Sequence, residues 1–295
     1  MFNRALPAQA LCATVFLAIT AAGAGPAQYQ DRSGKATIDS ALATQFVKTG
    51  LYVISGGGSN SVLRLSANGL ILVNGKLPGN YDALVKQATK ISDQPIRVVI
   101  VTDYHENHTG DSAKFLAAGT GIIAQENVKP ALDAYDPPGV KVVPPSLTYD
   151  HEYTLKLGGV EARLLHFGNA VTGGDTVVYF PNLKVVAVGD LFAPTPNPDF
   201  TAGGSLVGWG PTLAQVLKLD FDVAVPGTGP TATRADLEAF KTKVDTLVSR
   251  ATLLVKKGVP KEQLMAQLKT DDLGWRFNFT EDQLNRFYAE LSQAN

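Results

Sequence analysis

One stretch of the chain, from Val98 to Gly110, constrains the fold more than any other. It begins with Val98-Val99-Ile100-Val101, an apolar and β-branched run that predicts a buried strand. It continues with Thr102-Asp103-Tyr104-His105-Glu106-Asn107-His108-Thr109-Gly110, which holds two of the protein's four histidines. In open α/β sheets, functional sites form just beyond the carboxyl ends of the strands. The stretch therefore predicts a strand that brings metal-capable side chains to one edge of a sheet.

The side chains that follow this strand suit a divalent metal. The neutral imidazoles of His105 and His108 and the hard carboxylate of Asp103 fit Zn, Fe or Mn. A second apolar run, Val185 to Gly189, ends in Asp190, which we expect on the same rim as the histidine loop. The one cysteine, Cys12, lies in the N-terminal segment described next, so we expect no thiolate ligand in the folded protein.

Residues 1–27 have the pattern of a secretory signal peptide and its cleavage region. A short positive start, Met1 to Arg4, precedes an uncharged, largely apolar segment with small-residue cleavage sites after Ala24 or Ala27. Its apolar core is shorter than the ~20 residues that a spanning helix needs. We therefore expect a secreted, periplasmic protein without stable membrane insertion after cleavage. Residues 28–44 are interpreted as a lead-in segment.

The remaining chain alternates between regions rich in strands and regions with helices. Apolar runs predict strands, first at 51–55, 61–65, 70–73, 98–101 and 121–124, then at 147–149, 153–157, 160–167, 176–180, 184–188 and 223–225. Helical patterns cover 81–91, 112–118, 126–135 and 211–217, and 38–47 is interpreted as a possible helical turn. After Pro230 the pattern is helical, with Thr233 and Asp236 forming a capping box. This order predicts an α/β protein of two sheets with helices outside them.

Size and charge narrow the possible partners. About 270 residues remain after the signal segment, enough for one large domain with a full core. The net charge is −1 and no long run of like charge occurs, which argues against a nucleic-acid or lipid-surface partner. We therefore expect a small-molecule ligand or substrate.

Several motifs together resemble those of the metallo-β-lactamase-fold hydrolases. The loop 102–110 is similar to the family's T-H-x-H-x-D-H-x-G. Further matches follow in order: 170–180 with A-H-T-x-G-D, 188–192 with G-D-L-F, 225–230 with P-G-H-G-P, and 72–76 where the family has V-D-T. The resemblance covers roughly residues 45 to 232 and implies an αββα sandwich with its site at one edge, between the sheets. Residues 233–295 are then a helical C-terminal extension packed on this domain.

The resemblance also implies which ligands of the family's two-metal site are missing. At the seven ligand positions the family residue is kept only at His105, His108 and Asp190. Asp103 replaces the first histidine and can still coordinate. The other three positions hold residues that do not suit zinc: Asn107, Val171 and Thr228. The resemblance therefore implies at most one divalent metal, with zinc preferred and Fe or Mn as alternatives, on Asp103, His105, His108 and Asp190.

The catalytic base of the family is changed as well. In the family, the aspartate at position 107 orients the attacking water and takes its proton, and an amide cannot do this at neutral pH. Glu106 is the one nearby carboxylate that could act as a base instead. Asn74 replaces a family carboxylate that supports the loop from behind. The two-metal reaction of the family is therefore not expected to carry over.

Three functional hypotheses remain open. In the first, the protein is a catalytically silent fold member that binds a small molecule or a protein in the old cleft. In the second, a single rebuilt metal site hydrolyses an ester, thioester or lactam-type bond. In the third, the protein carries out chemistry without a metal. His166 is interpreted as a partly buried strand histidine and His151 as an exposed turn residue, while Trp209 either lines the cleft mouth or packs under the next helix.

Overall fold

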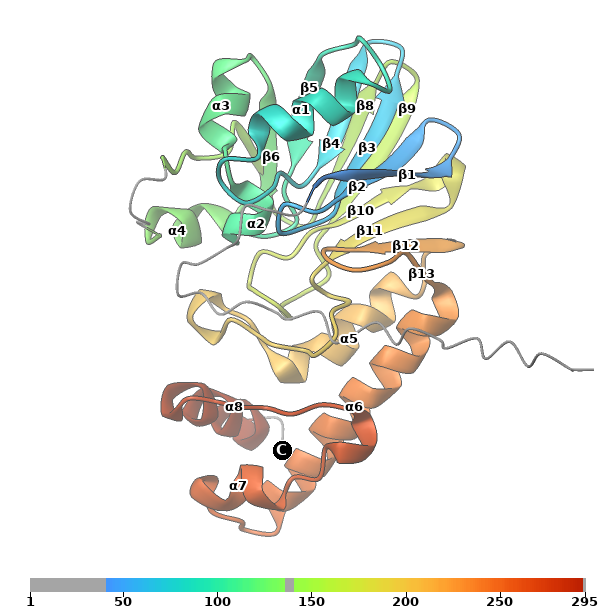
Figure 1. Cartoon of the computed structure of the whole chain (residues 1–295). Helices are drawn as coiled ribbons and strands as arrows, with labels where there is room; N and C mark the ends of the chain where they lie inside the picture. Colours follow the sequence, from blue (N-terminus) through green and yellow to red (C-terminus); the bar gives the residue numbers. More distant parts are fainter. Residues whose placement is uncertain (1–40, 136–140, 294–295) are drawn as a thin grey trace, which may run out of the picture.

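A computed structural model describes residues 41–135 and 141–293 of the chain. The signal segment expected at 1–27, the lead-in up to residue 40 and the Asp136-Pro137-Pro138-Gly139 helix stop lie outside the described residues. Two β-sheets form the centre of the fold, and helices cover the outer face of each (Figure 1). The predicted αββα sandwich of the metallo-β-lactamase type, with added C-terminal helices, is confirmed.

The first sheet has seven strands in sequence order. It begins as antiparallel hairpins, and the tight turn at Asn68-Gly69 pairs Ser66 with Gly69 as the dipeptide predicts. From β4 onward the pairing is parallel, so the carboxyl ends of β4, β5 and β6 meet at one edge. The strands are β1 (Ala43–Lys48), β2 (Leu51–Ser55), β3 (Ser61–Ser66), β4 (Gly69–Val73), β5 (Ile96–Ile100), β6 (Gly121–Gln125) and β7 (Leu147–Tyr149).

The second sheet has six strands in the order β13-β12-β11-β10-β9-β8. β11 and β12 run parallel, and the other neighbours are antiparallel. Its strands are β8 (Glu152–Leu157), β9 (Val160–Leu165), β10 (Val177–Phe180), β11 (Val185–Gly189), β12 (Val223–Pro226) and β13 (Ala232–Thr233). Backbone bonds from Asn60 N–H to Gly227 O (2.6 Å) and from Thr176 N–H to Thr102 O (2.7 Å) join loops of the two sheets at the edge where the polar loops lie.

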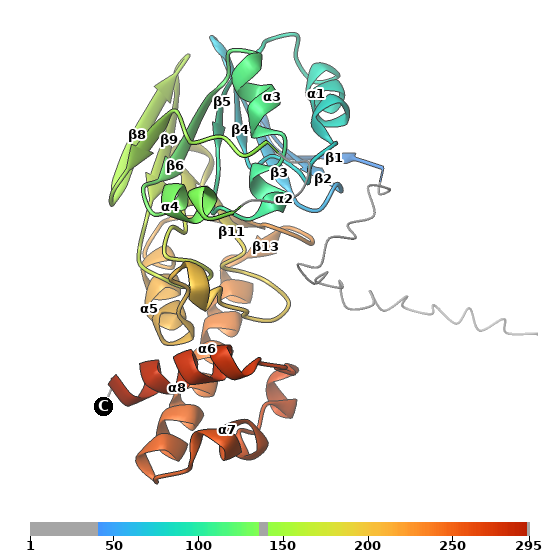
Figure 2. The same cartoon turned by 90° about the vertical axis from the view of Figure 1, so that its left-hand side faces the viewer.

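The helices complete four layers. On the first sheet lie α1 (Tyr81–Thr89), α2 (Glu106–Thr109), α3 (Ser112–Ala117) and α4 (Val128–Asp133), and beneath the second lie α5 (Leu206–Val216) and α6 (Arg234–Lys256) (Figures 1 and 2). Three apolar clusters fill the spaces between the layers. Ile100 and Val178 belong to the cluster between the sheets, Leu84 and Phe115 to the cluster under α1 and α3, and Trp209 to the cluster under the second sheet.

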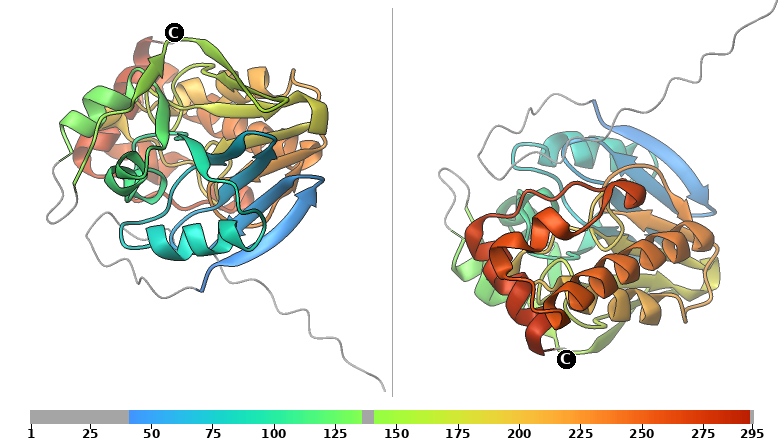
Figure 3. Two further views of the ribbon diagram at one scale, coloured as in Figure 1. Left: turned by 90° about the horizontal axis from the view of Figure 1, so that it is seen from above. Right: turned by 90° about the horizontal axis from the view of Figure 1, so that it is seen from below.

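The C-terminal helices share the core beneath the second sheet. α7 (Lys261–Gln267) and α8 (Glu281–Gln293) pack with α6 and lie below the sandwich (Figure 3). Leu247, Phe287 and Leu291 are fully buried in the same cluster as Val186 of β11. The capping box predicted at the start of α6 is present: the side chain of Thr233 accepts from Asp236 N–H, and the side chain of Asp236 accepts from Thr233 N–H.

Two local predictions were wrong. Residues 43–47 belong to strand β1 instead of a helical turn, because they pair with β2 over five positions and extend the sheet. The helix expected from Pro211 begins five residues earlier, where Ser205 accepts a hydrogen bond from Gly208 N–H as an N-cap. Trp209 consequently lies inside α5, fully buried, and does not line the cleft mouth.

No helix in residues 41–135 and 141–293 combines the length and the apolar character that crossing a bilayer requires.

A buried lysine secures the glycine-rich turn between β2 and β3. Gly56, Gly57 and Gly58 all have positive φ, a conformation that glycine adopts without steric cost. Lys76 is 1% exposed and donates from Nζ to Ile54 O (2.6 Å) and to Ser59 O, so it links both ends of this turn. Burial lowers the pKa of Lys76 to about 7.

The lowered pKa gives the free energy of unfolding a specific pH dependence. In the unfolded chain the lysine has a pKa of about 10.4, so between about pH 7 and pH 10 the unfolded state binds the extra proton. Stability should therefore rise with pH across this window, by up to about 1.4 kcal/mol per pH unit from this group. Urea unfolding between pH 7 and 10 should show this rise in the wild type and a flatter profile in Lys76→Met. Lys86→Met, on the exposed face of α1, should keep the wild-type slope; equal slopes in all three proteins would contradict the assignment.

Candidate metal centre

The central parallel strand of the first sheet delivers the histidine loop. β5 lies between β4 and β6, and its end, Val99 to Val101, is buried. The chain then turns into α2, a single helical turn in which His108 and Thr109 donate their N–H groups to the carbonyl of His105. This turn brings His105 and His108 back toward Asp103.

Asn74 supports the loop from behind without a charge. Its side-chain oxygen accepts from Thr102 N–H (2.8 Å), and its amide nitrogen donates to Thr102 Oγ1 (3.0 Å). Asn74 itself sits at φ 64°, a left-handed position that asparagine tolerates better than most residues. Thr102 Oγ1 in turn lies 3.3 Å from His108 Nδ1. Asn74 therefore supports the loop mechanically without adding a negative charge.

Asp103 connects the two imidazoles. Its Oδ1 lies 2.8 Å from His105 Nδ1 and accepts from the His105 N–H, while its Oδ2 lies 2.9 Å from His108 Nδ1. Asp103 is 1% exposed, His108 is inaccessible and His105 is 9% exposed. One carboxylate thus holds both rings and leaves the Nε2 atom of each on the side away from it.

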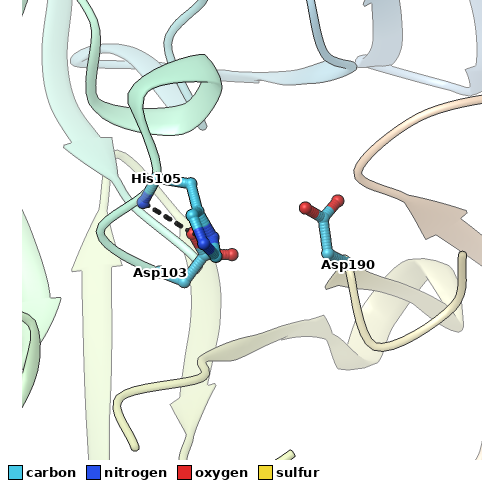
Figure 4. Close-up of side chains that lie close together, drawn as sticks. All are labelled: Asp103, His105 and Asp190. Atoms are coloured by element: carbon cyan, nitrogen blue, oxygen red, sulfur yellow. Dashed lines mark hydrogen bonds and ion pairs between the residues drawn. The ribbon is translucent and has the colours of Figure 1, made fainter. Parts of the chain in front are cut away.

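Asp190 approaches the same point from the second sheet. It follows β11 and faces Asp103 and His105 in Figure 4. Two glycines allow this approach: Gly189 has φ 53°, and a Cβ there would lie 2.6 Å from Thr102 Oγ1. A Cβ on Gly227 would lie 2.0 Å from Asp190 Oδ1. The carboxylate is therefore packed directly against bare backbone.

Three of the four predicted ligand residues converge, and the fourth lies beside them. Among the described residues, Asp103, His105 and Asp190 form a group whose ligand atoms all lie within 4.8 Å of one another. His108 adjoins it, with Nε2 3.6 Å from Asp190 Oδ1. This Nε2 is buried and has no hydrogen-bond partner within the described structure. An unpartnered imidazole nitrogen beside two buried carboxylates is a donor set that suits a divalent cation.

The charges in this cluster are strongly coupled. Burial would raise the pKa of Asp103, but the two imidazoles hold it well below its usual range. Burial would lower the pKa of His108, but the carboxylates of Asp103 and Asp190 raise it. The pKa of Asp190 is raised, chiefly by burial. A cation that binds these groups would therefore compete with protons for the same atoms.

The residues at the three positions where the resemblance implies lost ligands have other surroundings. Val171 is buried, and its backbone N–H is held by Asp175 Oδ2 at 2.7 Å. Asn107 donates weakly to Gly58 O (3.5 Å), and Thr228 lines a neighbouring pocket. Asp175, the aspartate of the G-D segment, has its pKa raised to about 8, mainly by burial, while accepting from the 170–172 backbone.

The other histidines and Glu106 lie elsewhere. His166, just past β9, contacts the carbonyl of Asp175 through Nδ1 (2.8 Å) and is half-buried, as expected. His151 is exposed. Glu106 lines a small pocket with Leu132 and other residues near α4. A role for Glu106 as a base therefore stays a prediction without support from its surroundings.

Sequence reasoning missed Asp199. Its carboxylate is 2% exposed, accepts from Tyr104 Oη and lies 3.7 Å from His105 Nε2. The loop that carries it, Ala193 to Asp199, is rich in proline and has no ligand-like spacing. The available signal was local: Asp199 followed two residues later by Thr201 is an N-cap pattern, and the cap forms.

A pocket of about 430 Å3 borders the cluster. Gly58, one of its lining residues, lies against Asn107, and Thr228, another, follows the glycine that packs on Asp190. The pocket is lined by Gln45, Val53, Ser55, Gly56, Gly58, Ser59, Asn60, Thr228, Gly229, Pro230 and Thr231. None of these side chains is charged. The pocket is large enough for a small, uncharged molecule.

A match to a family model establishes the family to which the motif loops point. The model of the metallo-beta-lactamase superfamily matches residues 54–228, which is more than half of the chain. The chain belongs to the metallo-beta-lactamase superfamily. Members of this superfamily typically bind zinc, and the Asp103–His105–Asp190 group lies within the matched residues.

Solved structures and a curated relative extend the comparison. The fold is similar to a metallo-beta-lactamase from Pontibacter korlensis (TM-score 0.62, 18% identity, 69% of this chain and 99% of that one). It is also similar to FIM-1 from Pseudomonas aeruginosa in its mono-zinc form (TM-score 0.61, 18% identity, 71% and 97%). In sequence, the chain is 27% identical over 147 residues to the 2,4-dinitroanisole O-demethylase subunit alpha of Nocardioides sp. strain JS1661. That match spans 50% of this chain and 44% of the relative.

The packing of Asp190 on Gly227 is open to a direct test. Gly227→Ala places a methyl group where Asp190 Oδ1 lies, so the carboxylate must move, and the substitution should destabilise the protein by about 1–3 kcal/mol in urea unfolding. Thr228→Ala, one residue later and at the pocket wall, should change the free energy of unfolding by less than about 0.5 kcal/mol. Equal midpoints for the two variants would show that Asp190 does not rest on Gly227.

Proposed function

We propose that this protein is a single-metal hydrolase of the metallo-beta-lactamase superfamily. The cation would be held by Asp103, His105, His108 and Asp190. The observation that carries the proposal is the buried His108 Nε2, which has no hydrogen-bond partner among the described residues and lies 3.6 Å from Asp190 Oδ1. Buried ionisable groups are costly unless they are paired or bind a metal. A cation between the imidazoles and the carboxylates would satisfy the unpartnered nitrogen.

Zinc is the first choice of metal. Two imidazoles and two carboxylates are compatible with Zn, and also with Fe or Mn. The superfamily's usual preference supports zinc, and the structural neighbour FIM-1 is described in a mono-zinc form. When bound, such a cation supplies Lewis-acid activation of water and of a substrate oxygen.

The residues of the chain arrange the metal ligands, and their part in proton transfer is smaller. Asp103 orients both imidazoles, and Gly189 and Gly227 let Asp190 reach them. Asn107 holds an amide where the superfamily has its proton-accepting aspartate, so no side chain at this position takes the proton from water. We therefore expect slower turnover than in members that keep the aspartate.

The proposed substrates are small and uncharged. The neutral pocket beside Thr228 supports this class, with ester, thioester or lactam bonds as the reacting groups. The curated relative is named for removing the methyl group of 2,4-dinitroanisole, so an activated aryl methyl ether belongs among the probes. We also propose that the protein is secreted, on the basis of the signal-like pattern of residues 1–27.

A second candidate function is binding without turnover. The amide of Asn107 favours it, because the residue that acts as the base elsewhere in the superfamily is lost. In this case the pocket would hold a small molecule whose bonds stay intact. The two candidates differ in one measurement, which is whether product forms in proportion to bound metal.

Metal analysis tests the proposal first. Purified protein, stripped with a chelator and reloaded with zinc, should retain one ion per chain after desalting. His105→Ala should lower the metal content to near zero, because the variant loses a ligand that faces two carboxylates. His151→Ala, which removes an exposed histidine, should bind as the wild type does. Two tightly held ions, or an unchanged content in His105→Ala, would reject the ligand set.

Activity then separates the two candidate functions. Hydrolysis of nitrophenyl ester, thioester, lactam and dinitroanisole probes should rise with the zinc content and fall in His105→Ala. A loaded protein that binds a probe without releasing product would establish the binding function in place of the hydrolase. Turnover that persists in fully chelated protein would instead point to chemistry without a metal.

A further inference from the structure

The backbone of Asp199 lies directly on the position where the ligand histidine is lost. Asp199 N–H donates to Val171 O (2.7 Å). Gly204 packs at the same contact. Its N–H donates to Asp199 O (2.8 Å), and a Cβ on it would lie 2.4 Å from Val171 O. The loop after β11 is therefore packed onto the segment that lacks the superfamily's histidine. This backbone contact fixes the loop whose carboxylate reaches His105.

The carboxylate of Asp199 is held in one orientation. Its Oδ1 accepts from Thr201 N–H (3.1 Å) and from Thr201 Oγ1 (2.6 Å). Its Oδ2 accepts from the hydroxyl of Tyr104, the residue next to His105, and the rings of Tyr104 and His105 are 4.7 Å apart at an angle of 30°. The oxygen that faces His105 is thus fixed by its neighbours and buried from water.

His105 lies between two carboxylates. Its Nδ1 is 2.8 Å from Asp103 Oδ1, and its Nε2 is 3.7 Å from Asp199 Oδ2. Asp103 and Asp190 belong to the converging ligand group, whereas Asp199 contacts the opposite nitrogen of the ring. An imidazole that binds a metal through one nitrogen usually donates the other N–H to a carboxylate, carbonyl or water. The contact of 3.7 Å between Nε2 and Asp199 Oδ2 is an ion-pair distance, longer than a hydrogen bond.

The C-terminal helices hold the loop that carries Asp199. Trp275, between α7 and α8, donates from Nε1 to Pro194 O (2.9 Å). Arg286 of α8 donates to Phe200 O (3.4 Å), and the rings of Phe200 and Phe279 meet edge to face at 6.1 Å. The position of the carboxylate is therefore set by the extension as well as by the sandwich.

We propose that Asp199 is a positioning residue for the metal centre, which fixes the ring of His105. It accepts the Nε2–H of His105 and so directs Nδ1 toward the point where Asp103 and Asp190 converge. The inference rests on the proposed single-metal site and assigns it a residue outside the superfamily motifs. It also explains why a site that lost a ligand at Val171 keeps a buried aspartate beside it.

Cobalt binding tests this role without relying on turnover. The full chain, stripped of metal, is titrated with Co²⁺ against a competing chelator, and the visible spectrum of the bound ion is recorded. Asp199→Asn should weaken the affinity by about 10–100-fold, the usual effect of removing a partner of a ligating histidine. Its spectrum should shift, and the exchangeable imidazole N–H proton of His105 should exchange faster in NMR of the cobalt-loaded protein.

Two further variants loosen the carboxylate of Asp199 while keeping its charge. Tyr104→Phe removes the hydroxyl that holds the Asp199 oxygen facing His105, and should weaken cobalt binding in the direction of Asp199→Asn by a smaller factor. Thr201→Val loosens the carboxylate through its other oxygen, and should weaken binding in the direction of Asp199→Asn while the fold is retained. It serves as the deciding variant if Asp199→Asn fails to fold.

The outcomes distinguish this inference from the proposed function. A wild-type chain that binds no cobalt would reject both. A wild type that binds one ion, with Asp199→Asn equal to it in affinity, spectrum and N–H exchange, would reject the role of Asp199 and leave the single-metal site intact. Should Asp199→Asn not fold, wild-type affinity and spectrum in Thr201→Val would reject it.

Discussion

The contact of one carboxylate with two imidazoles organises the edge of the sandwich. One oxygen of Asp103 contacts Nδ1 of His105, and the other oxygen contacts Nδ1 of His108. Three buried groups that would each be costly alone become a mutually compensated unit. Both rings are fixed on their Nδ1 side, and a second carboxylate lies on the Nε2 side of each. For His108 this is Asp190, and for His105 it is Asp199.

The two halves of the site come from different sheets, and glycines make the junction possible. β5 supplies the histidine loop and β11 supplies Asp190. A side chain at Gly189 would strike Thr102, and one at Gly227 would strike Asp190 itself. Side chains are thus excluded from the junction so that a carboxylate can reach the rings. The carboxylates of Asp103 and Asp190 thus meet the imidazoles of His105 and His108 at this edge.

Much of the fold and part of the site could be predicted from the sequence. The apolar runs before Asp103 and Asp190 each form a central strand, so strand polarity places each carboxylate at the carboxyl-end edge of its own sheet. The prediction failed for β1, whose identity depends on pairing with β2, and for the start of α5, which depends on the Ser205 cap. Asp199 could not be found because its neighbours, Val171 and His105, are distant in the sequence and meet only through loop packing.

The two tryptophans of the protein occupy an informative position. Trp209 donates its indole N–H to Leu191 O, and Trp275 donates its own to Pro194 O. Both therefore hold the short segment that runs from Asp190 toward Asp199. All the indole emission of the protein arises from residues bonded to this segment, so its intrinsic fluorescence acts as a built-in optical reporter of the loop that closes the metal centre.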